Sequence, residues 1–489
     1  MNQTDHLMRR PAFHFTPQRN WMNDPNGLVY DGGLWHLYYQ YNPEGPDWGN
    51  MSWGHATSPD LQHWTEHPVA LPYREGEQIF SGSIVATPSD VGSRLTAYYT
   101  SAYDDGHQAQ SRASSTDGGF TWEIDPNNPI LDRNTSAFRD PKVIRYTDAG
   151  GDVRWILLAV EADDRQVLFY SSTDLHTWEY QSSFGPLGVD GVVWECPDLI
   201  PLPVDGDPGD IRWVLLISAN PVGEDPDPEG SSMSYLIGDF DGTTFTADSS
   251  ELTRLDHGRD FYAGVTFDSA PAGETVMLGW MSNWSYAHEI PSAPWRGAMS
   301  LPRRLSLRTV GGSPRLIQQP PKFFQEQLVA ADPAARMSLA QPIHMALSGH
   351  SLMELQWDPN TTGRLRLTLQ GDAESEVVIV HSPETGALSV SRQGAAVQAV
   401  HAAFPSTSTV ALDVLAPVRL LLSLDGPLLE LFINDGEATA SNLVVLGSGP
   451  VTARLETGRP GPVSVRLCDV PETQTPARHS LPGSSPARL

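Results

Sequence analysis

Three acidic residues stand in short segments that could carry carboxylate chemistry: Asp24 in WMNDPNG, Asp140 in FRDPKV and Glu195 in WECPDL. Each acid is flanked by apolar residues and followed by a segment typical of a β-strand. Burying several carboxylates together raises and separates their pKa values, so that one can give a proton while another attacks as a nucleophile. If the fold brings the three acids together, they predict catalysis by an acid and a nucleophile.

The alternative for Asp24 and Asp140 is a structural turn. Both precede a proline, and Asp-Pro is a common turn opener that occurs eight times in this chain. Taken singly, such a dipeptide is more often a turn than a site. The position of these two within a repeat separates them from the other six.

The repeat is marked by the phrases SPDLQHW (58–64), STDGGFTW (115–122) and STDLHTW (172–178), whose tryptophans lie 58 and then 56 residues apart. Short runs rich in β-branched and aromatic residues surround each phrase, with turn residues between them. A unit of about sixty residues with roughly four strands is typical of a propeller blade, because one four-stranded sheet cannot bury its faces alone. Residues 1–310 are therefore predicted to form a five-bladed β-propeller in an all-β protein.

The acids fall at matching positions of this repeat. From Asp24, steps of 57, 59, 55 and 65 residues lead to Ser81, Asp140, Glu195 and Asp260. Because innermost strands crowd around the axis of a propeller, side chains at matching positions should point into one pocket. Four of the five positions carry a carboxylic acid.

The composition of the sequence and the spacing of its apolar residues change after residue 310. A segment with several glycines and prolines, 311–339, is expected to be a linker. Period-two segments such as RLRLTLQG and VRLLLSLDG then predict a β-sandwich over 340–470. The remaining residues, 471–489, are expected to be a disordered tail.

Bulk composition excludes several classes of function. A formal charge of −28 argues against binding to nucleic acid or an anionic membrane, and no apolar run is long enough to cross a bilayer. Cys196 and Cys468 have no metal-ligand spacing, and His63 and His67 are interpreted as surface residues, so neither a metal nor a cofactor is expected. Without an apolar leader before WMNDPNG, a cytoplasmic protein is expected.

Taken together, the motifs resemble those of glycoside hydrolase family 32, the β-fructosidases that include invertases, inulinases and levanases. The resemblance covers nearly the whole chain and implies a propeller followed by a β-sandwich. It is carried by WMNDPNG, YYQYNP, WGNMSWGHATSPDLQHW, FSGS, FRDPKV, WECPDL, DFYA, PWRGAMSLPR and FINDGE.

This resemblance implies a role for each acid. Asp24 would be the nucleophile, Glu195 the general acid and base, and Asp140 the stabiliser of the transition state, in a retaining release of terminal fructose from β-fructofuranosides such as sucrose and short fructans. Trp280, Trp284 and Trp295 would wall the substrate entrance, and which of them faces the sugar is left open. The residues implied to bind sugar or orient the acids are Asn23, Gln40, Trp48, Phe80, Ser81, Arg139 and Asp260.

Other functions compete with this one. An inverting arabinan-type hydrolase would share the blades and the acids, and a non-catalytic sugar-binding propeller would be expected to lack one of them. Within the family, a fructosyltransferase or a sucrose-6-phosphate-type hydrolase could use the same scaffold. The oligomeric state is not predicted.

Overall fold

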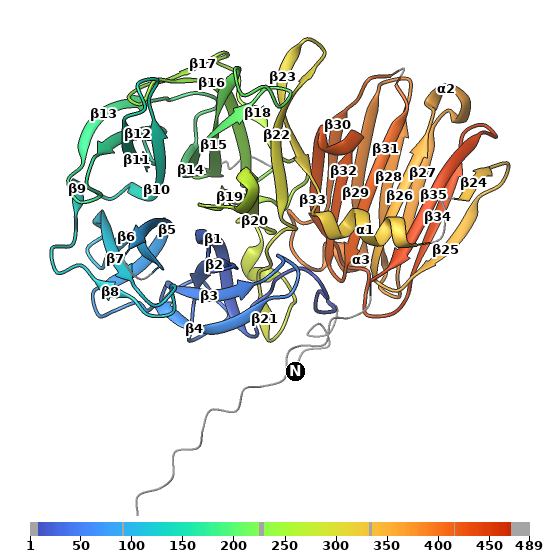
Figure 1. The fold of residues 1–489 in the computed structure, drawn as a ribbon. Helices are drawn as coiled ribbons and strands as arrows, with labels where there is room; N and C mark the ends of the chain where they lie inside the picture. Colours follow the sequence, from blue (N-terminus) through green and yellow to red (C-terminus); the bar gives the residue numbers. More distant parts are fainter. Residues whose placement is uncertain (1–7, 90–91, 224–228, 332–334, 415, 471–489) are drawn as a thin grey trace, which may run out of the picture.

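The structure is a computed structural model with two β-rich regions side by side (Figure 1). The expected disordered tail, 471–489, lies outside the described residues. These are 8–89, 92–223, 229–331, 335–414 and 416–470.

The N-terminal region is a β-propeller. Its described residues form five sheets around a common centre (Figure 1), antiparallel except where β21 pairs with β1. The innermost strands β1, β5, β10, β14 and β19 contact their neighbours around the ring. The first two sheets contain β1 (Asn20–Asp31), β2 (Leu34–Tyr41), β3 (Ser52–Ser58), β4 (Thr65–Leu71) and β21 (Trp295–Arg296), then β5 (Glu77–Ser89), β6 (Gly92–Tyr103), β7 (Gln108–Ser115), β8 (Glu123–Ile124) and β9 (Leu131–Thr135).

The next three sheets complete the ring. They contain β10 (Phe138–Thr147), β11 (Val153–Glu161), β12 (Gln166–Ser172) and β13 (Glu179–Phe184); β14 (Val192–Pro203), β15 (Ile211–Pro221), β16 (Ser232–Phe240), β17 (Phe245–Ala247) and β18 (Thr253–Arg254); and β19 (Tyr262–Thr266), β20 (Val276–Trp280), β22 (Arg303–Val310) and β23 (Ser313–Gln319). Two 3₁₀ turns, η1 (Pro271–Gly273) and η2 (Ala287–Glu289), lie within the last of these segments.

Two local features tie the sequence to this ring. The short strand β21 pairs in parallel with the start of β1, so that a late segment closes the ring onto the first strand. The three repeated phrases each begin on the last residue of a third strand and form the connection to the fourth. In each, the serine hydroxyl accepts a backbone N–H of the turn, at 2.8 Å for Ser58, 3.0 Å for Ser115 and 2.9 Å for Ser172.

The segment 311–339, expected to be a linker, instead contains regular structure. Gly311 and Gly312 have φ values of 60° and 88°, which suit a two-residue hairpin turn between β22 and β23. After that hairpin, helix α1 (Lys322–Ala330) buries Phe324 and Leu328 between the two regions. The glycine pair thus marks a turn within the last propeller sheet.

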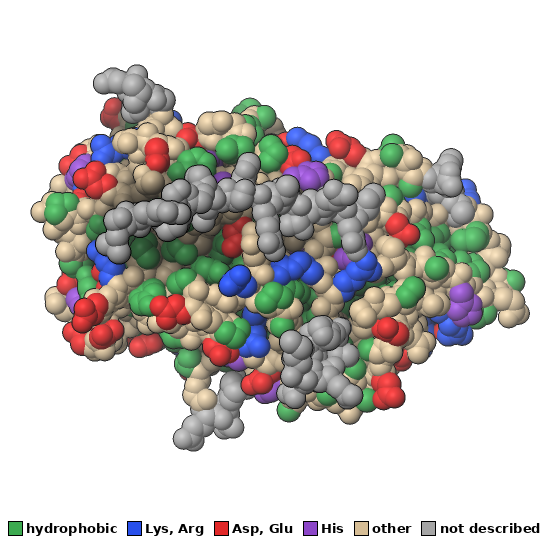
Figure 2. Space-filling model, turned by 90° about the horizontal axis from the view of Figure 1, so that it is seen from below, with side chains coloured by type: hydrophobic (Ala, Val, Ile, Leu, Met, Phe, Trp, Pro, Cys, Tyr) green, Lys and Arg blue, Asp and Glu red, His purple; other side chains and the backbone are tan. Residues whose placement is uncertain are grey.

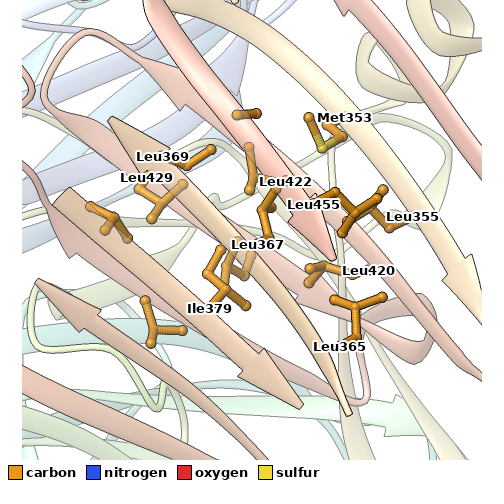
Figure 3. Close-up of a cluster of buried hydrophobic side chains, with 14 of the residues drawn as sticks. Met353, Leu355, Leu365, Leu367, Leu369, Ile379, Leu420, Leu422, Leu429 and Leu455 are labelled. Carbon is orange, nitrogen blue, oxygen red and sulfur yellow. The ribbon is translucent and has the colours of Figure 1, made fainter. Parts of the chain in front are cut away.

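The C-terminal region is a β-sandwich of two six-stranded sheets whose inner faces form one apolar core. Alternate residues of one sheet, such as Leu365 and Leu367, meet alternate residues of the other, such as Leu420 and Leu422 (Figure 3). One sheet has the order β24 (Ala335–Ser338), β35 (Pro462–Asp469), β26 (His350–Trp357), β31 (Val418–Asp425), β32 (Leu428–Ile433) and β33 (Ala438–Leu443), and the other β25 (Ile343–Leu347), β34 (Val451–Thr457), β27 (Leu365–Gln370), β28 (Ser375–Ser382), β29 (Ala387–Gly394) and β30 (Ser406–Ala411). The short helices are α2 (Pro359–Thr362), α3 (Ala395–Gln398) and η3 (Asn434–Gly436).

The surface reflects the acidic composition. Figure 2 shows acidic side chains spread over the face seen from below, interspersed with basic and apolar ones. No helix within the described ranges is long and apolar enough to span a membrane.

Candidate active site

Each innermost strand breaks its pairing register at an equivalent point, and β1 has a second break between Asn26 and Val29. The breaks fall between Met22 and Pro25, Phe80 and Gly82, Arg139 and Lys142, Glu195 and Asp198, and Tyr262 and Val265. Such a bulge bends the strand and re-aims its side chains. Five bulges at equivalent places therefore direct one set of side chains towards the propeller axis.

Two neighbouring positions recur at these breaks. The residue inside the break is Asp24, Ser81, Asp140, Cys196 or Ala263, and three of these have a positive φ: 62° for Asp140, 48° for Cys196 and 51° for Ala263. Strained backbone of this kind in non-glycine residues clusters at functional sites. The residue just before it is, in the same order, Asn23, Phe80, Arg139, Glu195 or Tyr262.

Asp24 is buried and held on both oxygens. The Ser81 hydroxyl donates to Oδ2 at 2.7 Å and the Asn23 amide donates to Oδ1 at 3.0 Å. Burial, and then the nearby charge of Glu195, raises the pKa of Asp24 to about 6 against the effect of these hydrogen bonds. The carboxylate is therefore fixed in direction yet poorly solvated, which suits a nucleophile.

Asp140 lies next to Asp24 across Cys196. The Cys196 thiol is 3.6 Å from Oδ2 of Asp24 and 3.7 Å from Oδ2 of Asp140, and the Cys196 backbone N–H donates to the latter oxygen at 2.9 Å. Burial raises the pKa of Asp140 to about 7, aided by the charges of Glu195 and Asp24, although Arg139 opposes the rise. Two buried carboxylates thus share one small site.

Glu195 is the most solvent-accessible of the three acids, with 19% of its side chain exposed. Arg139 donates to Oε1 through Nη2 at 3.0 Å, and the Tyr262 hydroxyl donates to Oε2. Because the carboxyl group is held between two donors and is the most accessible of the three, it is the acid best placed to exchange a proton with a bound molecule.

The other predicted residues divide between this pocket and its walls. Trp48 is 40% exposed, and its ring meets that of Phe80 edge-on at 5.7 Å, forming an apolar wall beside Ser81. Gln40 is buried in β2, and its amide donates to the carbonyl of Ile79, which precedes Phe80. Gln40 therefore supports this wall.

The three entrance tryptophans occupy different environments. Trp280 and Trp295 are buried, whereas Trp284 is half-buried and packs on Trp21 and Trp280. Trp284 is therefore the one of the three with an accessible part of its ring.

Asp260 does not join the pocket. It lies two residues before β19 begins, and its fully buried carboxylate faces the sandwich, where Arg392 donates to it at 2.7 Å. The residue of the fifth sheet that matches Asp140 is Ala263. Of the two roles expected for Asp260, binding sugar or orienting the acids, the first is replaced by a place at the domain interface.

Sequence reasoning overlooked Tyr262 and Cys196. Both could have been found by aligning pairs of residues: Glu195-Cys196 and Tyr262-Ala263 occupy the same two places as Arg139-Asp140. Among the described residues, no group of three His, Cys, Asp or Glu side chains is arranged to hold a metal. His63 is exposed and pairs with Asp60.

The two buried carboxylates and the third, more exposed acid on the propeller axis supply the unequal acid pair that a glycoside hydrolase uses. The family comparisons agree with this class. The family model for the "Glycosyl hydrolases family 32 N-terminal domain" matches residues 14–320, and the "Glycosyl hydrolases family 32 C terminal" model matches residues 321–450. The chain belongs to glycosyl hydrolase family 32.

Individual relatives support the same assignment. The chain is 36% identical to a levanase of Bacillus subtilis (strain 168) over 457 residues, covering 89% of this chain and 66% of the levanase. It is 41% identical to an extracellular exo-inulinase of Aspergillus niger over 350 residues, covering 64% of each. In both cases it spans just under two thirds of the relative. The crystal structure of exo-inulinase from Aspergillus awamori superposes with a TM-score of 0.86 at 32% identity, covering 95% of this chain and 98% of that one.

These relatives correct the expectation of a cytoplasmic protein, because the matching exo-inulinase is extracellular. The two free cysteines give the cytoplasmic expectation no support either, for a physical reason. Disulfides are needed chiefly by small domains with little core, whereas both regions here bury large apolar clusters. A low cysteine count is therefore no guide to the compartment.

Proposed function

We propose that this protein is a retaining β-fructofuranosidase that releases terminal fructose from short fructans and sucrose. The observation that carries the proposal is the unequal environment of the acids: Asp24 is buried and fixed by Ser81 and Asn23, whereas Glu195 lies nearer solvent between Arg139 and Tyr262. A nucleophile and a general acid require this asymmetry.

In the first step, Asp24 attacks C2 of the fructosyl unit. The bond between C2 and the glycosidic oxygen breaks as Glu195 gives its proton to that oxygen, so the leaving alcohol departs neutral and a fructosyl ester remains on Asp24. Asp140, held by the Cys196 N–H, accepts hydrogen bonds from sugar hydroxyls and stabilises positive charge developing at the ring.

In the second step, water replaces the leaving alcohol. Glu195, now ionised, takes a proton from the water. The water oxygen bonds to C2 as the ester bond between C2 and Asp24 breaks. Two inversions at the same carbon give net retention, and both acids return to their starting protonation states.

The choice of substrate rests on the pocket and on the relatives. Trp48 and Phe80 offer an apolar wall for a sugar face. The relatives are named levanase and exo-inulinase, which favours fructans. Sucrose is included because the proposed reaction needs only a terminal fructosyl unit, whichever alcohol it carries.

The direct test is release of fructose by the purified protein from sucrose, inulin and levan. Fructose should appear as the β-anomer before mutarotation, as followed by NMR. Accumulation of longer fructosides in its place would indicate a fructosyltransferase. The α-anomer would indicate inversion, and no product from any of the three substrates would refute the proposal.

Two variants test the roles. With an aryl β-fructofuranoside, whose leaving group needs no proton, Glu195→Ala should retain much of the kcat/KM that it loses on sucrose, whereas Asp24→Ala should be inactive on both. Equal recovery of the two variants would contradict the assignment.

The architecture carries two finer proposals. The five sheets around the axis are five blades of the propeller, and the boundary between propeller and sandwich lies after β23, near residue 320. Expression of 1–320 and 321–489 as separate chains, assayed for cooperative unfolding, would test that boundary.

A further inference from the structure

A propeller segment, Asp256–Asp260, lies along the edge of the sandwich. The Asp260 N–H donates to the carbonyl of Ser441 at 3.0 Å, and the Ser441 N–H donates to the Asp256 carboxylate at 2.8 Å. Ser441 belongs to β33, the last strand of its sheet, so the segment covers a strand edge. Gly258 is required here, since a Cβ would lie 1.9 Å from the Ser441 carbonyl oxygen.

At the end of this segment, the Asp260 carboxylate is saturated by three donors. Arg392 Nη1 and the Leu443 N–H each donate to Oδ2 at 2.7 Å, and the Tyr286 hydroxyl donates to Oδ1 at 2.6 Å. Arg392 also donates to the Tyr286 oxygen at 2.6 Å through Nη2. Arg392 comes from β29 of the sandwich, so one buried guanidinium joins two propeller segments.

The segment that ends at Asp260 continues along the chain to a residue that contacts Glu195. Asp260 is followed two residues later by Tyr262, whose hydroxyl donates to Glu195. The intervening Phe261 is buried, and Ala263 has a φ of 51°, so the backbone between Asp260 and the bulge has little room to adjust. A displacement of Asp260 would therefore be passed on to the Tyr262 hydroxyl.

The segment that contains Tyr286 is connected to Asp24 through packed aromatic rings. Tyr286 lies between Trp284 and His288, whose rings both stack on Trp21, at 5.9 Å and 4.6 Å. Trp21 donates to the Asn23 side chain, which holds Asp24. This path has more contacts than the first and ends on Asp24, which Ser81 also holds. A displacement of Arg392 should therefore move Asp24 less than it moves Glu195.

We propose that Arg392 of the sandwich is a positioning residue for Glu195 of the propeller, acting through Asp260 and Tyr262. The inference rests on the proposed function, in which Glu195 protonates the leaving group. It gives the sandwich a part in catalysis although no sandwich residue contacts the acids among the described hydrogen bonds.

The test compares two substrates that differ in their need for an acid. In Arg392→Lys the charge is kept but one ammonium cannot reproduce the forked contact with Asp260 and Tyr286. We expect kcat/KM on sucrose to fall about 10- to 100-fold, the range for a misplaced catalytic group, while kcat/KM on p-nitrophenyl β-D-fructofuranoside changes less than about threefold. A purely structural arginine would lower both in parallel, or neither, and either result would overturn the proposal.

A second variant guards against loss of folding. Arg392→Gln combined with Asp260→Asn removes both buried charges together, which avoids leaving one unpaired. The same selective loss on sucrose is expected. His14→Gln, at another buried interface site that does not touch Asp256–Asp260, is the matched control and should leave the ratio of the two substrates unchanged.

The route is tested by adding Tyr262→Phe. If Arg392 acts through Tyr262, the single variant Tyr262→Phe and its combination with Arg392→Lys should show the same loss on sucrose; multiplied losses would refute this route. The two proposals also fail differently. A wild-type protein inactive on both substrates refutes the proposed function, whereas an active wild type with an unchanged ratio in the Arg392 variants refutes only this inference.

Discussion

The propeller axis and the domain interface each hold a cluster of three carboxylates, counted at the interface apart from Asp260, but they surround them differently. On the axis, Arg139 pairs with Asp140 and Glu195, and none of the described ion pairs involves Asp24. At the interface, Asp256, Asp425 and Glu430 are matched by Arg303, His14 and His350. Arg303 lies 2.9 Å from Asp256 and 2.7 Å from Glu430, and His14 and His350 lie 2.7 Å and 2.6 Å from Asp425.

The difference sets the protonation of the two groups in opposite directions. Burial and mutual repulsion raise the pKa values of Asp24 and Asp140. At the interface burial acts in the same sense, but Arg303 lowers the pKa values of Asp256 and Glu430, and hydrogen bonds from His14 and His350 lower that of Asp425. Buried carboxylates therefore have raised pKa values on the axis, where few cations face them. At the interface their pKa values are lowered, because each carboxylate has a cationic or hydrogen-bonding partner.

The largest expected effect comes from removing a charge on the axis. Asp24→Asn should lower turnover on sucrose by at least about 10³-fold, because the amide is no nucleophile. It should also stabilise the fold. The unfolded aspartate loses its proton near its ordinary pKa and the folded one near 6, so above pH 6 the buried charge reduces stability by about 1–3 kcal/mol. Thermal unfolding at pH 7 should therefore give a higher Tm, and a lower one would contradict the comparison.

Removing a cation from the interface should do the reverse. Arg303→Met leaves Asp256 and Glu430 buried without their shared partner, and the free energy of unfolding should fall by about 3–5 kcal/mol. The partly exposed Arg419, paired with Glu354 within the sandwich, is the control, and Arg419→Met should lose less than about 1 kcal/mol. Equal losses in the two variants would deny the interface its special role.

His14 gives the network a pH dependence opposite in sign to that of a buried neutral histidine. Although burial opposes it, hydrogen bonds to Asp425 and Glu430 raise the pKa of His14 to about 9. Its stabilisation is complete below the unfolded pKa of about 6.5 and is lost as pH rises through 9, up to about 3 kcal/mol. In the propeller, burial lowers the pKa of His36 to about 4, so that residue destabilises the fold as pH falls below 6.5.

Unfolding measured by urea between pH 6 and 10 should therefore show a decline in stability that flattens in His14→Gln. The matched variant His36→Gln should leave this alkaline decline in place. A wild-type protein equally stable at pH 6 and pH 10 would show that His14 is not held as a cation.

The sequence predicted the axis better than the interface, and the reason is the range of the contacts. A period near sixty placed Asp24, Ser81 and Asp140 correctly because each lies in the same bulge of a repeated unit. In the fifth unit the spacing from Cys196 to Ala263 is 67 residues, because the segment Asp256–Asp260 first runs along the edge of β33. The nearest acid, Asp260, was therefore mistaken for the axial residue, which is Ala263.

The interface has no such period. His14 meets Asp425 across 411 residues of sequence, and Arg303 meets Glu430 across 127. A single sequence carries no signal that pairs residues so far apart without a repeat, although charged residues in apolar surroundings, as in ELFIND around Glu430, do indicate that a partner must exist.

The smallest expected effect is a shift in the pH dependence of kcat/KM when Ser81, a residue of the axis, loses its hydroxyl. Ser81 donates to Asp24 at 2.7 Å and is among the groups that keep the pKa of this acid from rising further. In Ser81→Ala the carboxylate loses a charge-assisted hydrogen bond of about 1.5–3 kcal/mol, part of which Asn23 and solvent recover. The acid limb of kcat/KM against pH, expected near 6 in the wild type, should move up by about one unit. Ser83→Ala is the control, because the Ser83 hydroxyl donates to the carbonyl of Pro141 instead of to an acid. If the limb stays in place in Ser81→Ala, the group titrating on the acid side is not Asp24, and the contrast between strained axial acids and satisfied interface acids would lose its kinetic support.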